Sequence, residues 1–252
     1  MISIADYNHL KQIMEESAEK KELLSRLLTS HKMDICTISH EIRNPLTLVY
    51  STLQLIEKQH PEALDFHHWS DLHNDIEYMK QLLEELSLFN NSSQLHISSI
   101  DTSTFFRTIA LSFASSLIET DIQFVSKIEP HLPVIQGDTL KLKESILNLL
   151  GNARDALTSY PADSKNPPTI SFSVTYIGDS LTVLISDNGC GISEEHLPHI
   201  FEPFVTYKRN GTGLGLAITS RIMQAHGGFI QVSSIPDLHT TFTLTLPVKK
   251  ST

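Results

Sequence analysis

The chain has 252 residues, of which 40% are hydrophobic and 19% charged, and its formal net charge is −10. This balance is typical of a globular protein, and the length permits one large domain or two modest ones. The acidic charge, with no basic run, argues against binding to nucleic acid or to an anionic membrane surface.

We also find no signal for a membrane span or for secretion. No stretch approaches about 18 uninterrupted apolar residues, and the first residues lack the pattern of a signal peptide. Cys36 and Cys190 are too few and too far apart to indicate a disulfide framework. We therefore expect a chain in the reducing cytoplasm.

The first third of the chain has a helical pattern. Apolar side chains recur at steps of three or four from Ile35 to Ile56, and again from Trp69 to Leu86. Pro61 lies between the two stripes, so we predict two long antiparallel helices joined by a short loop. Because two helices leave apolar surface uncovered, we expect two chains to combine into a four-helix bundle.

In the rest of the chain, segments with the helical spacing of apolar residues alternate with segments that have the two-residue period of strands. Strands that follow helices in this order indicate an α/β sandwich, a sheet with helices on one face. The predicted helices span about 102–118, 140–159 and 213–226, and the predicted strands span 122–128, 132–138, 169–177, 181–187, 228–234 and 240–247.

His40 is predicted to lie on the polar side of the first long helix. With Ile35 as the zero of a helical wheel, the apolar stripe spans about 300° to 20° and His40 lies near about 140°. Pro45 removes an N–H that would have bonded to the Glu41 carbonyl, so we expect a kink that costs roughly 3 kcal/mol. A lone helix histidine is usually structural or solvated, but an exposed neutral imidazole beside a carboxylate is a competent nucleophile. The segment therefore permits phosphoryl acceptance.

Two later segments suggest contacts to a nucleotide. Asn148 and Asn152 fall on one helical face and offer neutral oxygen donors suited to Mg²⁺ and phosphate. Asp187 ends a strand before Gly189 and Gly191. A carboxylate there can accept a hydrogen bond from an exocyclic amine, and the glycines let a ring lie against the backbone.

Two more segments follow toward the C-terminus. FEPF, at 201–204, precedes Lys208 and Arg209, which can face phosphate. GTGLGLAI, at 211–218, opens a helix whose free N–H groups favour an anion. Each segment alone is weak, but their order and contexts together predict an ATP site. A Walker loop is excluded, since no GxxxxGK[ST] occurs.

The same segments resemble the kinase core of the bacterial sensor histidine kinases of two-component signalling, and the similarity covers nearly the whole chain. SHEIRNPLT (39–47) is similar to the family's H box and NLLGNARDAL (148–157) to its N box. DNGCGI (187–192), FEPF and GTGLGLAI are similar to the G1, F and G2 boxes. The variants look most like the nitrogen-regulator and sporulation-kinase branches.

The leucine pattern of the opening segment predicts a helical lead-in at 1–30. The resemblance implies a dimerisation and histidine phosphotransfer domain at 31–95 and a Bergerat-type ATP-binding domain at 96–252. It implies an ATP-dependent protein histidine kinase that uses Mg²⁺, forms a homodimer through the hairpin, and passes phosphate to an aspartate on the receiver domain of a response regulator. A phosphatase activity toward that regulator is a further expectation. An upstream sensor module or protein would supply the signal, and the chain would be soluble or the cytoplasmic part of a membrane-anchored sensor.

The resemblance also implies roles for individual residues. His40 is the phosphoacceptor, Glu41 its base, and Asn44 would position water for dephosphorylation. Asn148 and Asn152 would hold Mg²⁺. The implied nucleotide contacts are Asn148, Asn152, Asp155, Asp187, Gly189, Gly191, Ile192, Phe204, Lys208, Gly211, Thr212, Gly213, Leu214 and Gly215.

Two positions depart from the family's pattern. Asp155 stands where some branches carry a basic residue, so one phosphate contact is expected to be lost. His239 stands where many relatives have glycine, in the last turn.

Two alternatives keep the ATP site but change the function. One is an ATP-driven conformational machine of the gyrase and heat-shock type, which steady ATP hydrolysis without a phosphoprotein would favour. The other is a non-catalytic phosphotransfer adaptor, which failure to bind adenine nucleotide would favour. The 13 histidines do not indicate a metal site, because no cysteine or acidic cluster with zinc spacing accompanies them.

Overall fold

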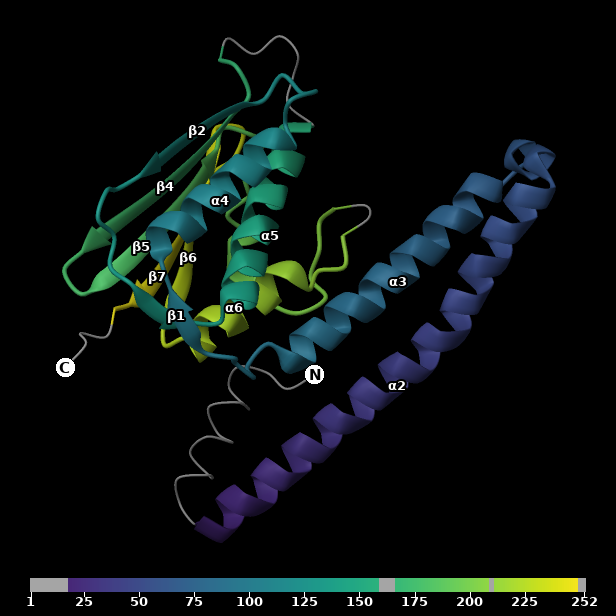
Figure 1. Ribbon diagram of the computed structural model, residues 1–252, viewed down its shortest axis with the longest axis horizontal. Coiled ribbons are helices and arrows are strands. Elements are labelled where there is room, and N and C mark those ends of the chain that lie inside the picture. Colours follow the sequence, from purple (N-terminus) through teal and green to yellow (C-terminus); the bar gives the residue numbers. More distant parts are fainter. Residues whose placement is uncertain (1–17, 159–165, 209–210, 249–252) are drawn as a thin grey trace. The chain divides into compact units, whose positions relative to one another are not determined.

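The computed structural model describes residues 18–158, 166–208 and 211–248 (Figure 1). The chain divides into two compact units, Met1–Asn90 and Asn91–Thr252. The predicted lead-in at 1–30 lies partly outside the described residues.

The first unit is a helical hairpin, as predicted. Helices α2 (Ala18–Gln59) and α3 (Trp69–Asn91) are joined by a connection that contains a 3-10 turn, η1 (Pro61–Asp65). Proline fits the first turn of η1 because its missing N–H has no partner there in any case. Helix α2 continues through Pro45 without a break, so the expected defect does not end the helix.

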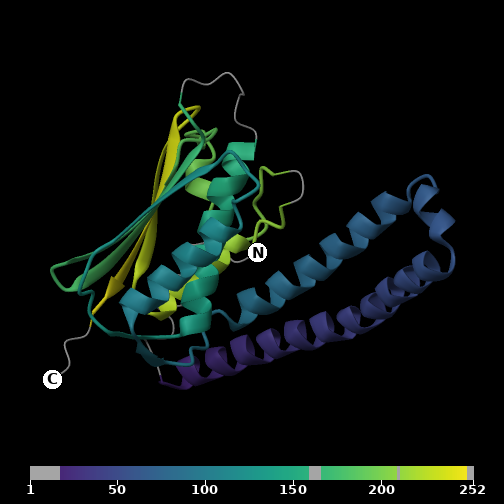
Figure 2. The same ribbon diagram turned by 45° about the horizontal axis from the view of Figure 1, so that its top comes forward.

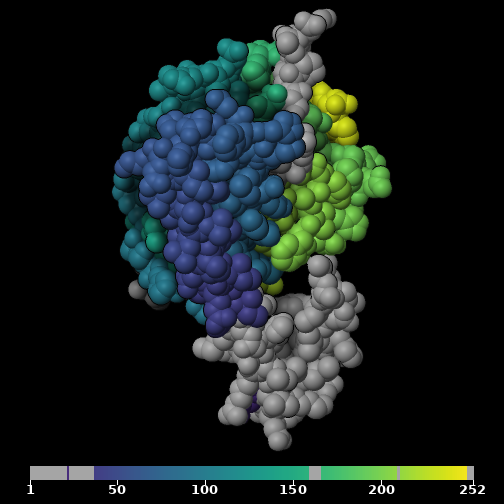
Figure 3. Space-filling model, turned by 90° about the vertical axis from the view of Figure 1, so that its right-hand side faces the viewer, coloured from purple at the N-terminus to yellow at the C-terminus, as the bar shows by residue number. Residues whose placement is uncertain are grey.

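Only part of each predicted apolar stripe is buried within the hairpin, where the side chains of the two helices lie against one another (Figure 3). The buried core consists of Leu46, Leu53, Ile76 and Leu83, with Tyr50 and Trp69 packed against it. Ile56 and Leu86 are half-buried, and five other stripe members form an exposed apolar flank made of Ile38, Ile42, Val49, Leu72 and Met79. This flank stays exposed because each helix meets its partner along one side only.

The second unit is a five-stranded sheet with helices on one face, which confirms the predicted α/β sandwich (Figure 2). The strand order is β2-β4-β5-β7-β6, in which the β2–β4 pair is parallel and the others are antiparallel. The strands are β2 (Gln123–Ile128), β4 (Thr169–Ile177), β5 (Ser180–Asp187), β6 (Phe229–Ile235) and β7 (His239–Pro247). The helices are α4 (Thr102–Ser115), α5 (Thr139–Thr158) and α6 (Gly215–Ala225).

Strand alternation fixes which side chains enter the core. In β5, Leu181, Val183 and Ile185 are buried and the residues between them are less so. Because side chains alternate with a period of two, Asp187 at the end of β5 points to the same buried side. A carboxylate is thereby placed at the edge of an apolar core.

Strand β1 (Ser98–Ile100) was not predicted, because the sequence showed only a polar connection there. It pairs antiparallel with β3 (Ile135–Gly137), which lies within the strand predicted at 132–138. Three residues are too few to show alternation. Among the described residues, no helix combines the length and the apolar character that crossing a membrane requires.

Candidate functional site

His40 is exposed on α2, as expected, and so are Glu41 and Asn44. The terminal nitrogen Nη1 of Arg43 lies 3.5 Å from His40 Nδ1. The other terminal nitrogen of Arg43, Nη2, donates to α3, at 3.3 Å from the Leu83 carbonyl oxygen and 3.1 Å from a serine hydroxyl. Arg43 therefore links the imidazole to the second helix of the hairpin.

The Arg43 contact constrains the imidazole. A guanidinium can only donate, so a hydrogen bond at this contact needs a lone pair on His40 Nδ1, which is the tautomer with the ring hydrogen on Nε2. In that tautomer Nε2 has no free lone pair, so it can act as a nucleophile only after the ring hydrogen moves to Nδ1. Sequence reasoning gave Arg43 no role, although a spacing of three residues on a helix places the two side chains together.

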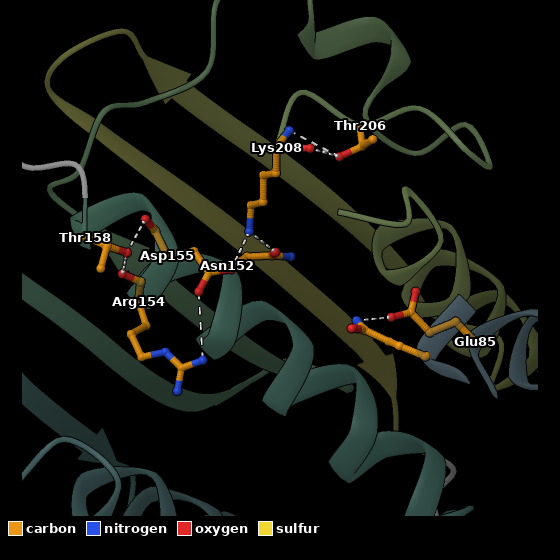
Figure 4. A network of polar contacts seen from close by, with 8 residues as sticks. Glu85, Asn152, Arg154, Asp155, Thr158, Thr206 and Lys208 are labelled. Atoms are coloured by element: carbon orange, nitrogen blue, oxygen red, sulfur yellow. Dashed lines mark hydrogen bonds and ion pairs between the residues drawn. The ribbon is translucent and has the colours of Figure 1, made fainter. Parts of the chain in front are cut away.

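In the second unit, Lys208 reaches from its loop to two N-box residues on α5 (Figure 4). Its Nζ donates to Asn152 Oδ1 at 2.7 Å and to Asp155 Oδ2 at 2.8 Å. Because Asp155 stands where some branches of the family carry a basic residue, we expected this helix to lack a positive charge for phosphate. In the structure Asp155 instead holds a cation that comes from the loop, so the positive charge is supplied from another segment.

Asn148, one turn before Asn152, contacts α6 at both ends of its amide. Its Nδ2 donates to Thr219 Oγ1 at 3.0 Å. Its Oδ1 faces the first residue of α6, because a Cβ built on Gly215 would lie 2.5 Å from that oxygen. Any larger residue at position 215 would displace the amide.

Asp187 is only 5% exposed and accepts a hydrogen bond of 3.0 Å from the Gly189 backbone N–H. Burial raises the pKa of Asp187 to about 6, an effect partly offset by that hydrogen bond and by the charges of His239 and Lys208. A buried carboxylate with a raised pKa is typical of a functional site. The electrostatic link to His239 was not expected from the sequence.

The loop after Asp187 approaches other backbone closely. Gly191 has φ +67°, and a Cβ there would collide with the Ile235 carbonyl oxygen, so only glycine fits. The next residue, Ile192, donates its N–H to Ser234 Oγ at 2.8 Å. Gly189 packs against α5, where a Cβ would lie 2.7 Å from the Ala156 carbonyl oxygen. The loop is thus fixed against both the sheet and a helix.

The glycine-rich segment before α6 contacts the backbone of the FEPF segment. Phe204 has φ +66° and donates its N–H to the Gly213 carbonyl at 2.9 Å. Gly213 has φ +71°, and a Cβ there would lie 2.6 Å from the Phe204 carbonyl carbon. Thr212 and Leu214 are buried, while Gly211 packs against Thr206.

Helix α6 begins without a side-chain cap in the part of the chain that the structure describes. Its first N–H groups, together with the helix dipole, therefore favour a bound anion such as phosphate. Gly215 and Asn148 stand at this end of the helix.

These residues fit ATP with Mg²⁺. The buried carboxylate of Asp187 suits the amine of adenine. The uncapped start of α6 and the Lys208 ammonium suit the phosphates. The side-chain amide oxygens are ligands of the kind that Mg²⁺ accepts beside phosphate and water. The predicted phosphoacceptor and its neighbours belong to the first unit.

Comparison with known protein families gives two matches on this chain. Residues 35–94 match the "His Kinase A (phospho-acceptor) domain". Residues 137–250 match the "Histidine kinase-, DNA gyrase B-, and HSP90-like ATPase" family.

Curated relatives carry similar descriptions. The chain is 30% identical to the signal transduction histidine-protein kinase AtoS of Escherichia coli over 93% of its own length and 37% of that protein. It is 31% identical to sporulation kinase B of Bacillus subtilis over 93% of its own length and 55% of that protein. The chain thus spans about a third to a half of these relatives.

Solved structures share the fold. Full-length ShkA in complex with AMPPNP is 24% identical and superposes with a TM-score of 0.70. The match covers 87% of this chain and 46% of the ShkA chain. The histidine kinase AdeS of Acinetobacter baumannii is 20% identical, with 84% of this chain and 98% of that chain covered and a TM-score of 0.57.

Proposed function

The chain belongs to the histidine kinases of two-component signalling, and we propose on this basis that it phosphorylates His40 from ATP and passes the phosphoryl group to an aspartate of a response regulator. The observation that carries the proposal is the exposure of His40 in a phospho-acceptor domain that an ATPase domain follows on the same chain. We assign phosphotransfer and dimerisation to 31–95 and catalysis to 96–252.

In this proposal the second unit binds and orients ATP. Asp187, ionised above its raised pKa, accepts a hydrogen bond from the adenine amine. The start of α6 and the Lys208 ammonium hold the phosphates. The Asn148 and Asn152 oxygens would hold Mg²⁺ once Lys208 leaves Asn152 Oδ1 for the phosphates, and the bound ion would neutralise phosphate charge and orient the γ-phosphate.

The first unit supplies the nucleophile. His40 releases its contact with Arg43 and places its hydrogen on Nδ1, where Glu41 accepts it. The Nε2 lone pair then forms a bond to the γ-phosphorus, while the bond from that phosphorus to the bridging oxygen breaks and ADP leaves with the electron pair. Positioning supplies most of the rate in such transfers, since the protein contributes little covalent chemistry.

The proposed partners follow from the hairpin. The exposed apolar flank, which includes Ile42 and Val49 at 49% and 48% exposure, supports a homodimer in which a second copy covers it. The His40 side of α2 is the surface for a receiver domain, and Asn44, exposed one turn further on, supports the additional phosphatase activity. An upstream sensor and a cytoplasmic location stay predictions.

The test uses γ-labelled ATP and Mg²⁺ with the whole chain. A kinase gives a labelled protein, stable in alkali and labile in acid, and added ADP returns the label to ATP because the phosphoramidate is high in energy. The ATPase alternative gives steady release of labelled phosphate and no labelled protein. That second result would overturn the proposal, since no phosphohistidine would form.

A further inference from the structure

Thr219 is a polar residue on the buried face of α6. Its side chain is fully buried, beside Ile218, Ile222 and Met223. A hydroxyl in such surroundings is costly unless it is hydrogen-bonded. Its partner is Asn148 Nδ2, 3.0 Å away on the neighbouring helix.

The two ends of the Asn148 amide face different residues of the same helix. Nδ2 donates to Thr219, while Oδ1 is the amide atom nearest to Gly215, one turn earlier on α6, where a Cβ would lie 2.5 Å from Oδ1 and 3.0 Å from Nδ2. The positive end of a helix dipole favours the carbonyl oxygen beside Gly215 over the amino group. The helix dipole thus selects the orientation of the amide, and the Thr219 hydroxyl, which can accept as well as donate, anchors the amino group in that orientation.

Orientation decides what this amide can bind. With Oδ1 toward the start of α6, Asn148 presents an acceptor to Mg²⁺, which takes oxygen ligands. If the amide turned over, the same position would present an NH₂ group, which cannot ligate a cation.

We propose that Thr219 is a positioning residue of the nucleotide site, which fixes the Asn148 amide with its oxygen directed to phosphate-bound Mg²⁺. The inference rests on the proposed function, because it assumes that ATP with Mg²⁺ binds at α5 and α6. Groups that orient a metal ligand typically change metal affinity about 10- to 100-fold when they are removed.

A purely structural role for Thr219 makes a different prediction. If the contact only packs α6 against α5, its loss lowers thermal stability and weakens all nucleotide binding alike. A positioning role acts on the metal ligand, so its loss shows mainly when Mg²⁺ is present.

The experiment compares the whole wild-type chain with Thr219→Val, which keeps the shape and removes the hydroxyl, and Thr219→Ser, which restores it. Thr219→Ala provides a second variant without a hydroxyl if the valine variant does not fold. The control is Thr102→Val, since Thr102 is also fully buried and donates one hydrogen bond, of 2.8 Å, to the Pro133 carbonyl. Binding of ATP is measured calorimetrically across a Mg²⁺ series and in excess EDTA.

We expect Thr219→Val to need about tenfold more Mg²⁺ for half-maximal ATP binding, with an affinity in EDTA within about twofold of wild type. Thr219→Ser and Thr102→Val should keep the wild-type Mg²⁺ requirement, even if the latter lowers the melting temperature. An unchanged Mg²⁺ requirement in Thr219→Val, or an equal loss with and without Mg²⁺, would overturn the inference. Failure of the wild-type chain to bind ATP would instead refute the proposed function.

Discussion

Replacing Asp187 by asparagine should stabilise the second unit and at the same time weaken ATP binding. Burial raises the pKa of Asp187 from 3.8 to about 6. Each pKa unit corresponds to about 1.4 kcal/mol, so holding the folded carboxylate ionised costs up to about 3 kcal/mol. Asparagine keeps the acceptor for the Gly189 N–H and carries no charge.

The sign of the effect depends on pH. With a raised folded pKa, the stability that Asp187 contributes is fully present below pH 3.8 and is lost as the pH rises through about 6. The asparagine variant avoids this loss. Its advantage should therefore be greatest above pH 7 and shrink toward zero as the pH falls to 4.

Urea denaturation at several pH values measures this difference. Circular dichroism follows the whole chain, whereas fluorescence of the single tryptophan, Trp69, reports only the first unit and should not change. Asp138→Asn is the control, because the expected change in stability has the opposite sign. Burial would raise the pKa of Asp138, but backbone N–H groups of His96, Lys141 and Leu140 outweigh it and lower the pKa, so this variant should be less stable above pH 4.

The binding side of the prediction is independent. Removing a charged acceptor costs about 1.5–3 kcal/mol, so Asp187→Asn should bind ATP at least about tenfold more weakly at pH 8. A variant that is less stable than wild type at pH 8, or that binds ATP normally, would refute the reasoning about this carboxylate.

Three further predictions concern Lys208, Gly213 and the exposed apolar flank of the hairpin. Lys208→Met should weaken ATP binding several-fold and reduce its dependence on salt, and titrations in low and high salt that match wild type would contradict this. Gly213→Ala should cost about 1–3 kcal/mol in thermal unfolding and weaken ATP binding, because φ is +71° and the Cβ meets Phe204; a variant like wild type in both would contradict it. Val49→Glu should convert a dimer to monomers in analytical ultracentrifugation, since it places a charge in the exposed apolar flank, and an unchanged dimer would show that another surface mediates association.

Periodic patterns made much of the fold predictable from the sequence. Strand β4 has the predicted bounds, Thr169–Ile177, because a long alternation leaves little freedom of register. The exposure of His40 followed from its angle on a helical wheel. Strand β1 was missed because three residues show no period and its pairing with β3 is a long-range contact.

The chemical details of the site depend on contacts that sequence spacing does not show. The ion pair between Lys208 and Asp155 joins residues 53 positions apart, so the sequence suggested a missing charge where the structure has one supplied by a loop. The contact of Thr219 with Asn148 spans 71 positions. Only the tertiary packing of helices and loops brings such partners together.

The central claim is that ATP phosphorylates His40. Its most direct test is a brief incubation with γ-labelled ATP and Mg²⁺ of the wild-type chain, His40→Gln, and His67→Gln as a control at another exposed histidine of the hairpin. We expect acid-labile, alkali-stable label on wild type and His67→Gln, and none on His40→Gln, although that variant should bind ATP with unchanged affinity. Equal labelling of His40→Gln would contradict the assignment of His40 as phosphoacceptor.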